Sequence, residues 1–288
     1  MRKIGSGAFG TVYLAHSPWS GEYCAIKKIN APNAKMMKHA MREVKIHGLI
    51  NHLNIIKYFG SSKGTTHVLL CMELVHKNLC SLICEMPPMS VDMSLFFFEQ
   101  LVTGLAYLHL RGIFHRDIKV DNLLVTRDGV IKICDFGLAN YHVDDEGHEV
   151  KHKMHAGSYR NMAPEIFMQE NANSTMFYYG SPTDIWSAAI VLFYFITETY
   201  PWSKPTLKDP RFCRWNRTRD LGSRWRLTST HDTCKLMSAM LRVTPKNRLC
   251  AAEIVKRIQT NLLEVPQRQL QKKTVTKIIK ENRKKLVG

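Results

Sequence analysis

The hydrophobic pattern of this chain changes near residue 75, and the change restricts the folds open to it. Before that point, short β-type runs are punctuated by glycine and interrupted by one helical pattern at 34–50. After it, long helical patterns dominate. Strands followed by helices predict an α+β fold with a β-rich lobe, residues 1–75, and a larger helical lobe, residues 76–264. We expect strands at 11–15, 23–29, 55–59 and 67–74 and helices at 91–110, 183–199, 231–242 and 251–263.

The two ends of the chain carry weaker signals. Only three residues precede Ile4, so the first strand is expected to be nearly missing. Residues 265–288 form a polar, basic segment that is compatible with a helix. We expect this segment to be a tail appended to the second lobe.

Charge and cysteine content narrow the class of function. The formal net charge is +17, but lysine and arginine are spread along the 288 residues. We therefore prefer a solvated basic surface to a nucleic-acid-binding patch as the interpretation of this charge. The eight cysteines lack metal-ligand spacing. The longest apolar stretch, 188–196, is too short to span a bilayer. We therefore expect a monomer in the nucleus and cytoplasm, with no membrane partner.

A glycine pattern lies near the start of the chain. Gly5, Gly7 and Gly10 fit GxGxxG, a string that dinucleotide-binding domains also use. In those domains the last glycine begins a helix, whereas here it begins the β-type run 11–14. A glycine loop between two strands can fold over triphosphate oxygens, because its backbone N–H groups approach them closely.

A lysine and a glutamate follow at positions that suit phosphate binding. Lys27 lies on the next expected strand, where alternation points Lys28 to the opposite face. Glu43 falls within an apolar stripe of the helix at 34–50, where an unpaired carboxylate would be costly. Either the helix is rotated and Glu43 is solvated, or Glu43 pairs with Lys27, which we prefer. The other members of the stripe are Met36, Ala40, His47 and Ile50, with His47 expected to be a packed core residue.

Three further motifs follow in order along the chain. Residues 115–122, His-Arg-Asp-Ile-Lys-Val-Asp-Asn, match the HRD…N pattern of phosphoryl-transfer loops. Asp135-Phe136-Gly137 and Ala163-Pro164-Glu165 come next. With the glycine loop, lysine and glutamate ahead of them, these motifs resemble those of the eukaryotic protein kinase family across essentially the whole chain. The resemblance implies the bilobal protein kinase fold, with ATP and Mg²⁺ as cofactors.

The resemblance also implies a role for each motif residue. Asp117 would accept the proton of the substrate hydroxyl, and Lys119 would neutralise the γ-phosphate during transfer. Asn122 and Asp135 would bind Mg²⁺ through oxygen atoms. Met72 would form the back wall of the nucleotide pocket, with plain core packing as the alternative. The implied nucleotide contacts are Ile4, Gly5, Gly7, Gly10, Val12, Ala25, Lys27, Glu43, Met72, Glu73, Val75, Asn122, Leu124 and Asp135.

Two structural links are implied in the second lobe. Asp184 would anchor the catalytic loop from the central helix, and Glu165 would form a buried ion pair with Arg248. Breaking a buried pair of this kind typically costs about 3–5 kcal/mol.

The acceptor residue can also be read from the motifs. Lys119 and Ser158 match the pattern of kinases that phosphorylate serine and threonine. Asn161, however, stands where a tyrosine is usual, two residues before Ala163. Dual specificity therefore remains an alternative.

A finer resemblance is to the checkpoint kinase 1 subfamily, carried by 51–60, 201–205, Trp215 and Trp225. It implies a role in DNA-damage checkpoint or cell-cycle signalling and protein substrates with arginine three positions before the acceptor. Asp121 suits such an arginine, but Asn78 replaces the second acidic residue of that subfamily. The selectivity for arginine is therefore left open.

The segment between Asp135 and Ser158 suggests how activity is controlled. Its only hydroxyl-bearing residue is Tyr141, so we hypothesise that the chain needs no phosphorylation there. Acidic residues would instead supply the negative charge that Arg116 takes from a phosphate in other kinases. The alternative is a solvated acidic loop that contacts nothing. The acidic residues concerned are Asp144, Asp145, Glu146 and Glu149.

Two other classes of protein remain as alternatives. A non-catalytic, kinase-like scaffold could use the basic segment 265–288 to bind partners. A nucleic-acid-binding module has only the net charge in its favour, because no RNP, zinc-finger or helix-turn-helix signature is present.

Overall fold

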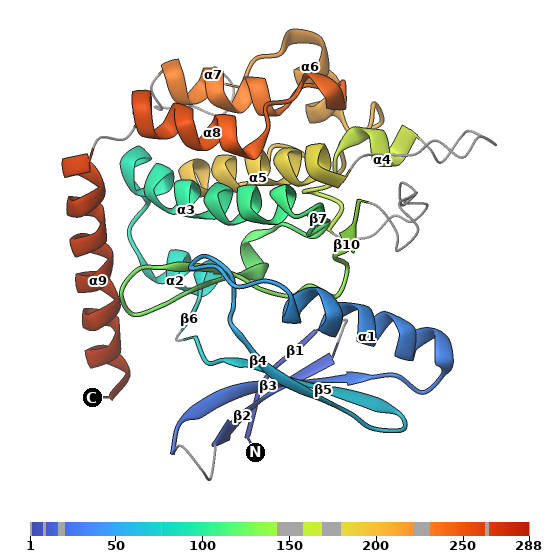
Figure 1. The fold of residues 1–288 in the computed structure, drawn as a ribbon. Helices are drawn as coiled ribbons and strands as arrows, with labels where there is room; N and C mark the ends of the chain where they lie inside the picture. Colours follow the sequence, from blue (N-terminus) through green and yellow to red (C-terminus); the bar gives the residue numbers. More distant parts are fainter. Residues whose placement is uncertain are drawn as a thin grey trace.

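The protein has two lobes, as the sequence predicted (Figure 1). The computed structural model describes residues 2–7, 10–16, 21–75, 77–142, 158–168, 180–221, 231–262 and 265–287. The first lobe is an antiparallel sheet in the order β1-β2-β3-β5-β4, with helix α1 packed against β4 and β5. Its elements are β1 Arg2–Gly7, β2 Gly10–His16, β3 Tyr23–Asn30, α1 Ala34–Gly48, β4 Tyr58–Lys63 and β5 His67–Glu73.

The second lobe is mainly helical and carries two small sheets, β10-β7 and β6-β8-β9. Helices α3 and α5 form its centre, and α7 and α8 lie beyond them on the side away from the first lobe (Figure 1). The elements are β6 Lys77–Asn78, α2 Leu79–Glu85, α3 Val91–Leu110, β7 Ile113–Phe114, η1 Val120–Asn122, β8 Leu123–Val125, β9 Ile131–Ile133, β10 Asn140–Tyr141, α4 Pro164–Met168, α5 Gly180–Thr197, α6 Pro210–Thr218, α7 His231–Met240, η3 Pro245–Asn247, α8 Ala251–Arg257, the π-helical turn η4 Ile258–Leu262 and α9 Val265–Val287.

Most expected elements of the first lobe are present, with three corrections. The first strand is not nearly missing, because β1 pairs with β2 from Arg2 to Gly7. The strand expected at 55–59 begins only at Tyr58, since Ile55 and Ile56 are buried against β9 instead. Met36 does not belong to the buried stripe of α1 and is 44% exposed. The first turn of α1, capped by the side chain of Asn33, therefore faces away from the sheet at this position.

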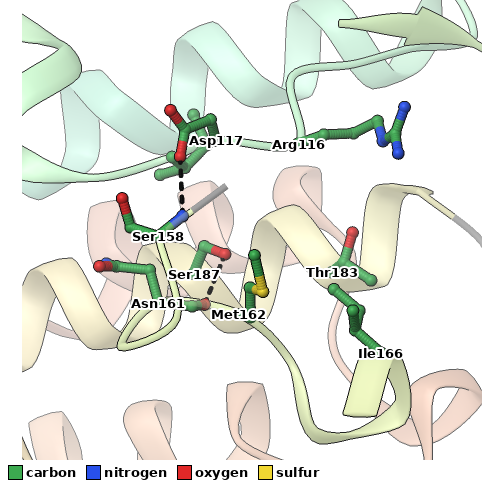
Figure 2. Close-up of a pocket in the computed structure, with 9 residues that line it drawn as sticks. Arg116, Asp117, Ser158, Asn161, Met162, Ile166, Thr183 and Ser187 are labelled. Atoms are coloured by element: carbon green, nitrogen blue, oxygen red, sulfur yellow. Dashed lines mark hydrogen bonds between the residues drawn. The ribbon is translucent and has the colours of Figure 1, made fainter. Parts of the chain in front are cut away.

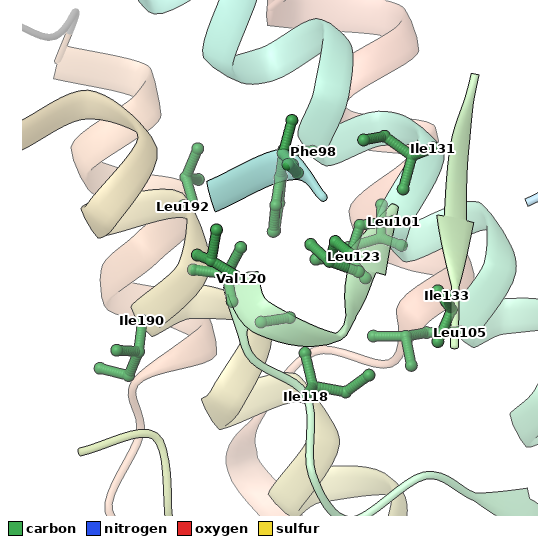
Figure 3. Packing of buried hydrophobic residues seen from close by; sticks show 14 of the residues in the cluster. Phe98, Leu101, Leu105, Ile118, Val120, Leu123, Ile131, Ile133, Ile190 and Leu192 are labelled. Atoms are coloured by element: carbon green, nitrogen blue, oxygen red, sulfur yellow. The ribbon is translucent and has the colours of Figure 1, made fainter. Parts of the chain in front are cut away.

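The core of the second lobe also holds the catalytic loop in place (Figure 3). Ile118, Val120 and Leu123 are fully buried and point among apolar side chains of α3, α5 and β9. Lys119 and Asn122, to which the resemblance assigned chemistry, lie between them, and Asp117 directly precedes Ile118. Burial of these three side chains fixes the backbone of the loop, because core side chains occupy single, close-packed positions. The surrounding side chains include Phe98, Leu101, Leu105, Ile131, Ile133, Ile190 and Leu192.

Helix α3 forms part of this core. Within the part of the chain that the structure describes, it is the one helix long and apolar enough to cross a membrane by length and composition alone. In the protein, 61% of its most apolar stretch is buried. The helix packs against α5, α8 and α9.

The basic segment expected to be a tail forms a long helix, α9, that runs along one side of the molecule (Figure 1). Gln271, Val275 and Ile279, spaced by four residues, are buried. Val275 lies so close to the β8–β9 turn that a Cβ on Gly129 would come within 2.9 Å of its Cγ1. Arg268 on this helix pairs with Glu99 of α3 at 2.8 Å. The segment is therefore packed onto the second lobe and is not an extended appendage.

Candidate active site

A buried lysine joins the two lobes. Lys27 on β3 donates from Nζ to Glu43 Oε1 of α1 at 2.6 Å and to Asp135 Oδ1 at 2.7 Å. Alternation on β3 buries Lys27, whereas Lys28 faces the other side and is partly exposed. The predicted pair between Lys27 and Glu43 is therefore present. Asp135 of the Asp-Phe-Gly motif accepts a hydrogen bond from the same ammonium group.

The charges in this cluster stabilise one another. Burial alone would lower the pKa of Lys27, but the nearby Glu43 and Asp135 outweigh it and raise that pKa. Burial would raise the pKa of Asp135, yet the Lys27 ammonium outweighs it and lowers that pKa. Lys27 is therefore held as a cation and Asp135 as an anion. Together they form a compact pair of charges at the junction of the lobes.

A second cluster surrounds Asp117 in the catalytic loop. Its carboxylate accepts hydrogen bonds from Lys119 Nζ at 2.7 Å and from the amide of Asn122 at 3.0 Å. The other carboxylate oxygen accepts from the backbone N–H of Ser158 at 3.1 Å. Lys119 also donates to the Ser158 hydroxyl at 3.1 Å. The aspartate is thus fixed between the catalytic loop and the segment that precedes α4.

Asp184 of α5 holds the catalytic loop, as predicted. Its carboxylate accepts from the backbone N–H groups of His115 at 2.9 Å and Arg116 at 2.8 Å. His109 of α3 contacts the same carboxylate at 3.0 Å through Nε2. Burial would raise the pKa of Asp184, but the hydrogen bond with His109 and the neighbouring charges lower it. The loop therefore rests on an ionised, buried carboxylate.

Two motif residues have backbone conformations that non-glycine residues rarely adopt. Arg116 has φ of 69° and Asp135 has φ of 66°. Residues in this left-handed region cost of order 1–3 kcal/mol each and persist only where the surroundings fix them. Here the anchor at Asp184 and the ion pair with Lys27 supply that constraint. One strained residue, Asp135, is an expected metal ligand, and the other, Arg116, directly precedes Asp117.

The predicted nucleotide contacts of the sheet lie on neighbouring strands. Ala25 of β3 is paired with Met72 of β5, and both are buried. Val12 of β2 is paired with Lys27 and with Gly5 of β1. These residues are therefore brought together beside the lysine.

The remaining predicted contacts lie at the edges of this region. Leu124 on β8 and Val75 after β5 are partly buried and pack against the core. Ile4 on β1 is 45% exposed. Glu73 uses one carboxylate oxygen in an ion pair with Lys132 of β9 at 2.8 Å. Gly7 lies on β1, at its pairing with β2.

Gly10 is required by a close approach of two strands. Its φ is 144°, and a Cβ at this position would lie 2.3 Å from the backbone carbonyl oxygen of Lys28. No side chain fits that distance. The last glycine of the loop thus lets the start of β2 lie close against the backbone of β3, the strand that carries Lys27.

The donor set around Asn122 and Asp135 fits a magnesium ion. Asn122 donates through Nδ2 to the backbone oxygen of Asp117 at 2.8 Å and to its carboxylate, which leaves the amide oxygen for a cation. Asp135 uses Oδ1 for Lys27 and for the Gly137 N–H, and no described residue donates to Oδ2. The backbone N–H of Cys134 donates to the Asn122 carbonyl at 3.0 Å, which ties the two ligands together. Carboxylate and amide oxygens are the ligands that Mg²⁺ prefers.

A small pocket lies between the catalytic loop and α5 (Figure 2). Its lining includes Asp117, Ser158 and Asn161, and the Ser187 hydroxyl donates to the Asn161 carbonyl at 2.8 Å. Asn161 is buried, and its Nδ2 finds no partner among the residues the structure describes. Asn161, which departs from the usual kinase pattern, therefore lines the same pocket as Asp117.

The large lobe contains the second predicted link. Arg248 makes two parallel hydrogen bonds to Glu165, each of 2.6 Å. Its other donors reach backbone carbonyls of Arg242, Pro182 and Val243. The predicted ion pair is therefore present, and its guanidinium is fully buried.

Comparison with known proteins identifies the class that this site defines. Residues 1–258 match the family model described as the protein kinase domain. The chain therefore belongs to the protein kinase family.

Its relatives narrow the class further. The chain is 31% identical over 261 residues to serine/threonine-protein kinase SRK2C of Arabidopsis thaliana, covering 88% of this chain and 72% of that protein. It is 31% identical to serine/threonine-protein kinase SAPK1 of Oryza sativa subsp. japonica, with the same two coverages. MAP kinase kinase kinase mkh1 of Schizosaccharomyces pombe is 31% identical over 69% of this chain and 18% of that protein. The chain is a serine/threonine protein kinase, and these relatives do not support the checkpoint kinase 1 subfamily in particular.

Sequence reasoning missed several contacts of the site. The pair between Glu73 and Lys132 links the junction of the lobes to β9, and nothing in the spacing of the two residues indicates it. The contact of His109 with Asp184 was also missed, although a histidine in the last turn of an otherwise apolar helix was a usable signal. His47 was correctly expected in the core, where its Nε2 lies 2.7 Å from the Ile56 carbonyl oxygen.

Proposed function

We propose that this kinase transfers the γ-phosphate of ATP to serine and threonine of protein substrates, with Mg²⁺ bound by Asn122 and Asp135. The observation that carries the proposal is the convergence of Lys27, Glu43 and Asp135 from β3, α1 and the Asp-Phe-Gly motif. A scaffold would have no need for a buried lysine that pairs with two carboxylates, one buried and one partly exposed, because burying charged groups costs desolvation energy.

The residues of the chain would act mainly by positioning and charge. Lys27, held by Glu43, would bind the α- and β-phosphates, and the Mg²⁺–ATP complex supplies the phosphoryl group. Asp117 would orient the substrate hydroxyl and accept its proton. Lys119, which contacts Asp117 and Ser158, would neutralise charge on the transferred group.

A peptide-library assay with radiolabelled ATP and Mg²⁺ tests this proposal. The wild-type chain is expected to label serine and threonine peptides, and Lys27→Met is expected to lose that labelling because the phosphate ligand is gone. Lys28→Met, altered on the opposite face of the same strand, is the matched control and should retain activity. Absence of transfer by the wild-type chain would favour the scaffold, and labelling of tyrosine would favour dual specificity.

We also propose that activity does not require phosphorylation between Asp135 and Ser158. Tyr141, the only hydroxyl-bearing residue in that interval, lies on β10 and has its hydroxyl oxygen buried. The acidic residues proposed to substitute for a phosphate, within 144–149, lie outside the described residues. Phosphatase treatment of the purified chain is expected to leave its specific activity unchanged. Loss of activity, restored by rephosphorylation, would reject the proposal.

Selectivity for arginine three positions before the acceptor is expected to be weak. Asn78, at the position of the second acidic residue, caps α2 through its Oδ1 and donates to the backbone oxygen of Asp121 at 2.7 Å. Asp121 alone is left to meet an arginine, and it is exposed. An exposed ion pair is worth about 0.2–1 kcal/mol, or roughly a 1.4-fold to fivefold preference. Peptides differing only by arginine or alanine at that position measure this ratio, and Asp121→Asn should bring it to about one.

The cellular role is proposed on the sequence alone. The resemblance of 51–60 and 201–205 to the checkpoint kinase 1 subfamily motivates a role in checkpoint or cell-cycle signalling, in the nucleus and cytoplasm. Deleting the gene and exposing the cells to DNA damage tests it. Unchanged cell-cycle arrest in the deletion strain would count against this role.

A further inference from the structure

A pocket unrelated to the proposed chemistry lies in the second lobe, beside α6 and α7 and the segment that leads to η3. These elements lie at the end of the molecule away from the first lobe (Figure 1). The pocket has a volume of about 310 Å³, near the lower limit for small-ligand sites. Trp215 and Leu241 are its buried apolar residues, and Ser238, Thr244 and Asn247 supply polar side chains.

Two arginines share this pocket. Arg219, at the end of α6, and Arg242, after α7, both line it. Both side chains are exposed, and partial burial and the charge of Arg242 lower the pKa of Arg219. Neither forms an ion pair with any residue in the described ranges. Two neighbouring cations of this kind are stabilised by an anion placed between them.

Nearby acidic side chains do not supply that anion within the described residues. Asp232 pairs with Lys235 on α7 at 3.3 Å, and Glu165 pairs with Arg248. Asp220 follows Arg219 in the sequence but does not line the pocket.

Arg219 is also held in an unusual backbone conformation. It ends α6 with φ of 57° and ψ of 15°, the left-handed conformation that glycine adopts most easily at this position. Its guanidinium lies 4.9 Å from the centre of the Trp215 ring, within the range of a cation–π contact. The side chain is thus oriented over the floor of the pocket, at a steric cost that glycine would avoid.

We propose that this pocket binds a phosphorylated side chain of a protein partner. The phosphate would lie between Arg219 and Arg242, since guanidinium groups bind phosphate through paired N–H donors. The apolar part of the ligand would pack against Trp215 and Leu241. The pocket has room for one such group, which favours a single phosphate monoester over the extended backbone of a nucleic acid. This binding site would act independently of phosphoryl transfer at Asp117.

Phenyl phosphate is a suitable probe because it combines a phosphate monoester with an apolar group. We expect it to bind the full chain, as measured by isothermal titration calorimetry, and to raise the thermal midpoint. No binding of phenol should be detected, and inorganic phosphate should bind more weakly than phenyl phosphate. Failure of phenyl phosphate to bind at about 10 mM would overturn the proposal, since this is far above the range of useful ligand affinities.

Arg219→Gly is the informative variant, because glycine suits the left-handed conformation and the fold is not put at risk. It is expected to weaken phenyl phosphate binding at least about tenfold, as the loss of a charge-assisted hydrogen bond implies. Arg214→Ala is the matched control, since Arg214 is exposed on the same helix and does not line the pocket. Equal affinities in wild type and Arg219→Gly would reject the site. Tighter binding of a single-stranded DNA 12-mer than of phenyl phosphate, lost in Arg219→Gly, would assign it to nucleic acid instead.

Discussion

Replacing Asp117 with asparagine is expected to lower kcat for peptide phosphorylation by about 10²–10⁴-fold, the usual contribution of a general base. The substitution keeps an oxygen that can accept from the Ser158 N–H, now 3.1 Å away, so the loop should retain its position. It removes the group that would take the proton of the substrate hydroxyl. The KM for ATP should change little, because Asp117 is not among the proposed phosphate or metal ligands.

The measurement is a steady-state assay of labelled peptide with saturating ATP and Mg²⁺. Asp128→Asn is the matched control, because Asp128 lies in the exposed turn between β8 and β9. This variant makes the same substitution, aspartate to asparagine, away from the site and should leave kcat unaltered. A loss of less than about tenfold in Asp117→Asn would mean that Asp117 is not the general base.

The local pattern of the sequence was sufficient to predict the pairing of Lys27 with Glu43, whereas the roles of the other site residues came from the resemblance to the protein kinase family. The pair of Lys27 and Glu43 could be predicted because strand alternation and helical spacing each direct one charged side chain toward the interior. Two buried charges of opposite sign stabilise one another. Asp184 and the pair of Glu165 with Arg248 came from the family resemblance, since these residues are remote in sequence and no local period connects them.

What could not be predicted depends on tertiary contacts. Met36 fits the helical period of α1 but lies where the first turn has no sheet beneath it. Ile55 and Ile56 have the composition of a strand, yet Ile55 bridges Ile133 of β9 and Ile56 N–H donates to the same residue. The docking of α9 was hidden because, among its residues whose side chains the structure describes, only Gln271, Val275 and Ile279 are buried. These are too few for an apolar stripe to stand out in a basic segment.

The second large effect concerns the stability of the helical lobe. Glu165→Ala is expected to reduce the free energy of unfolding by about 3–5 kcal/mol, because it leaves the guanidinium of Arg248 buried without its counter-ion. The guanidinium also lies 5.0 Å from the centre of the Trp186 ring, so it is enclosed by protein on several sides. At roughly 2–4 °C per kcal/mol, the thermal midpoint should fall by about 6–20 °C. Differential scanning calorimetry measures this change.

Asp232→Asn provides the matched control for loss of an ion pair. Asp232 and Lys235 are 3.3 Å apart but more than half exposed, so breaking this pair should cost no more than about 0.5 kcal/mol. If both variants shifted the midpoint equally, burial would not explain the cost. The double variant Glu165→Leu, Arg248→Met separates the two contributions to the loss. It should be more stable than Glu165→Ala, because no uncompensated charge then remains in the core, and apolar side chains of similar volume can replace a buried pair with little loss.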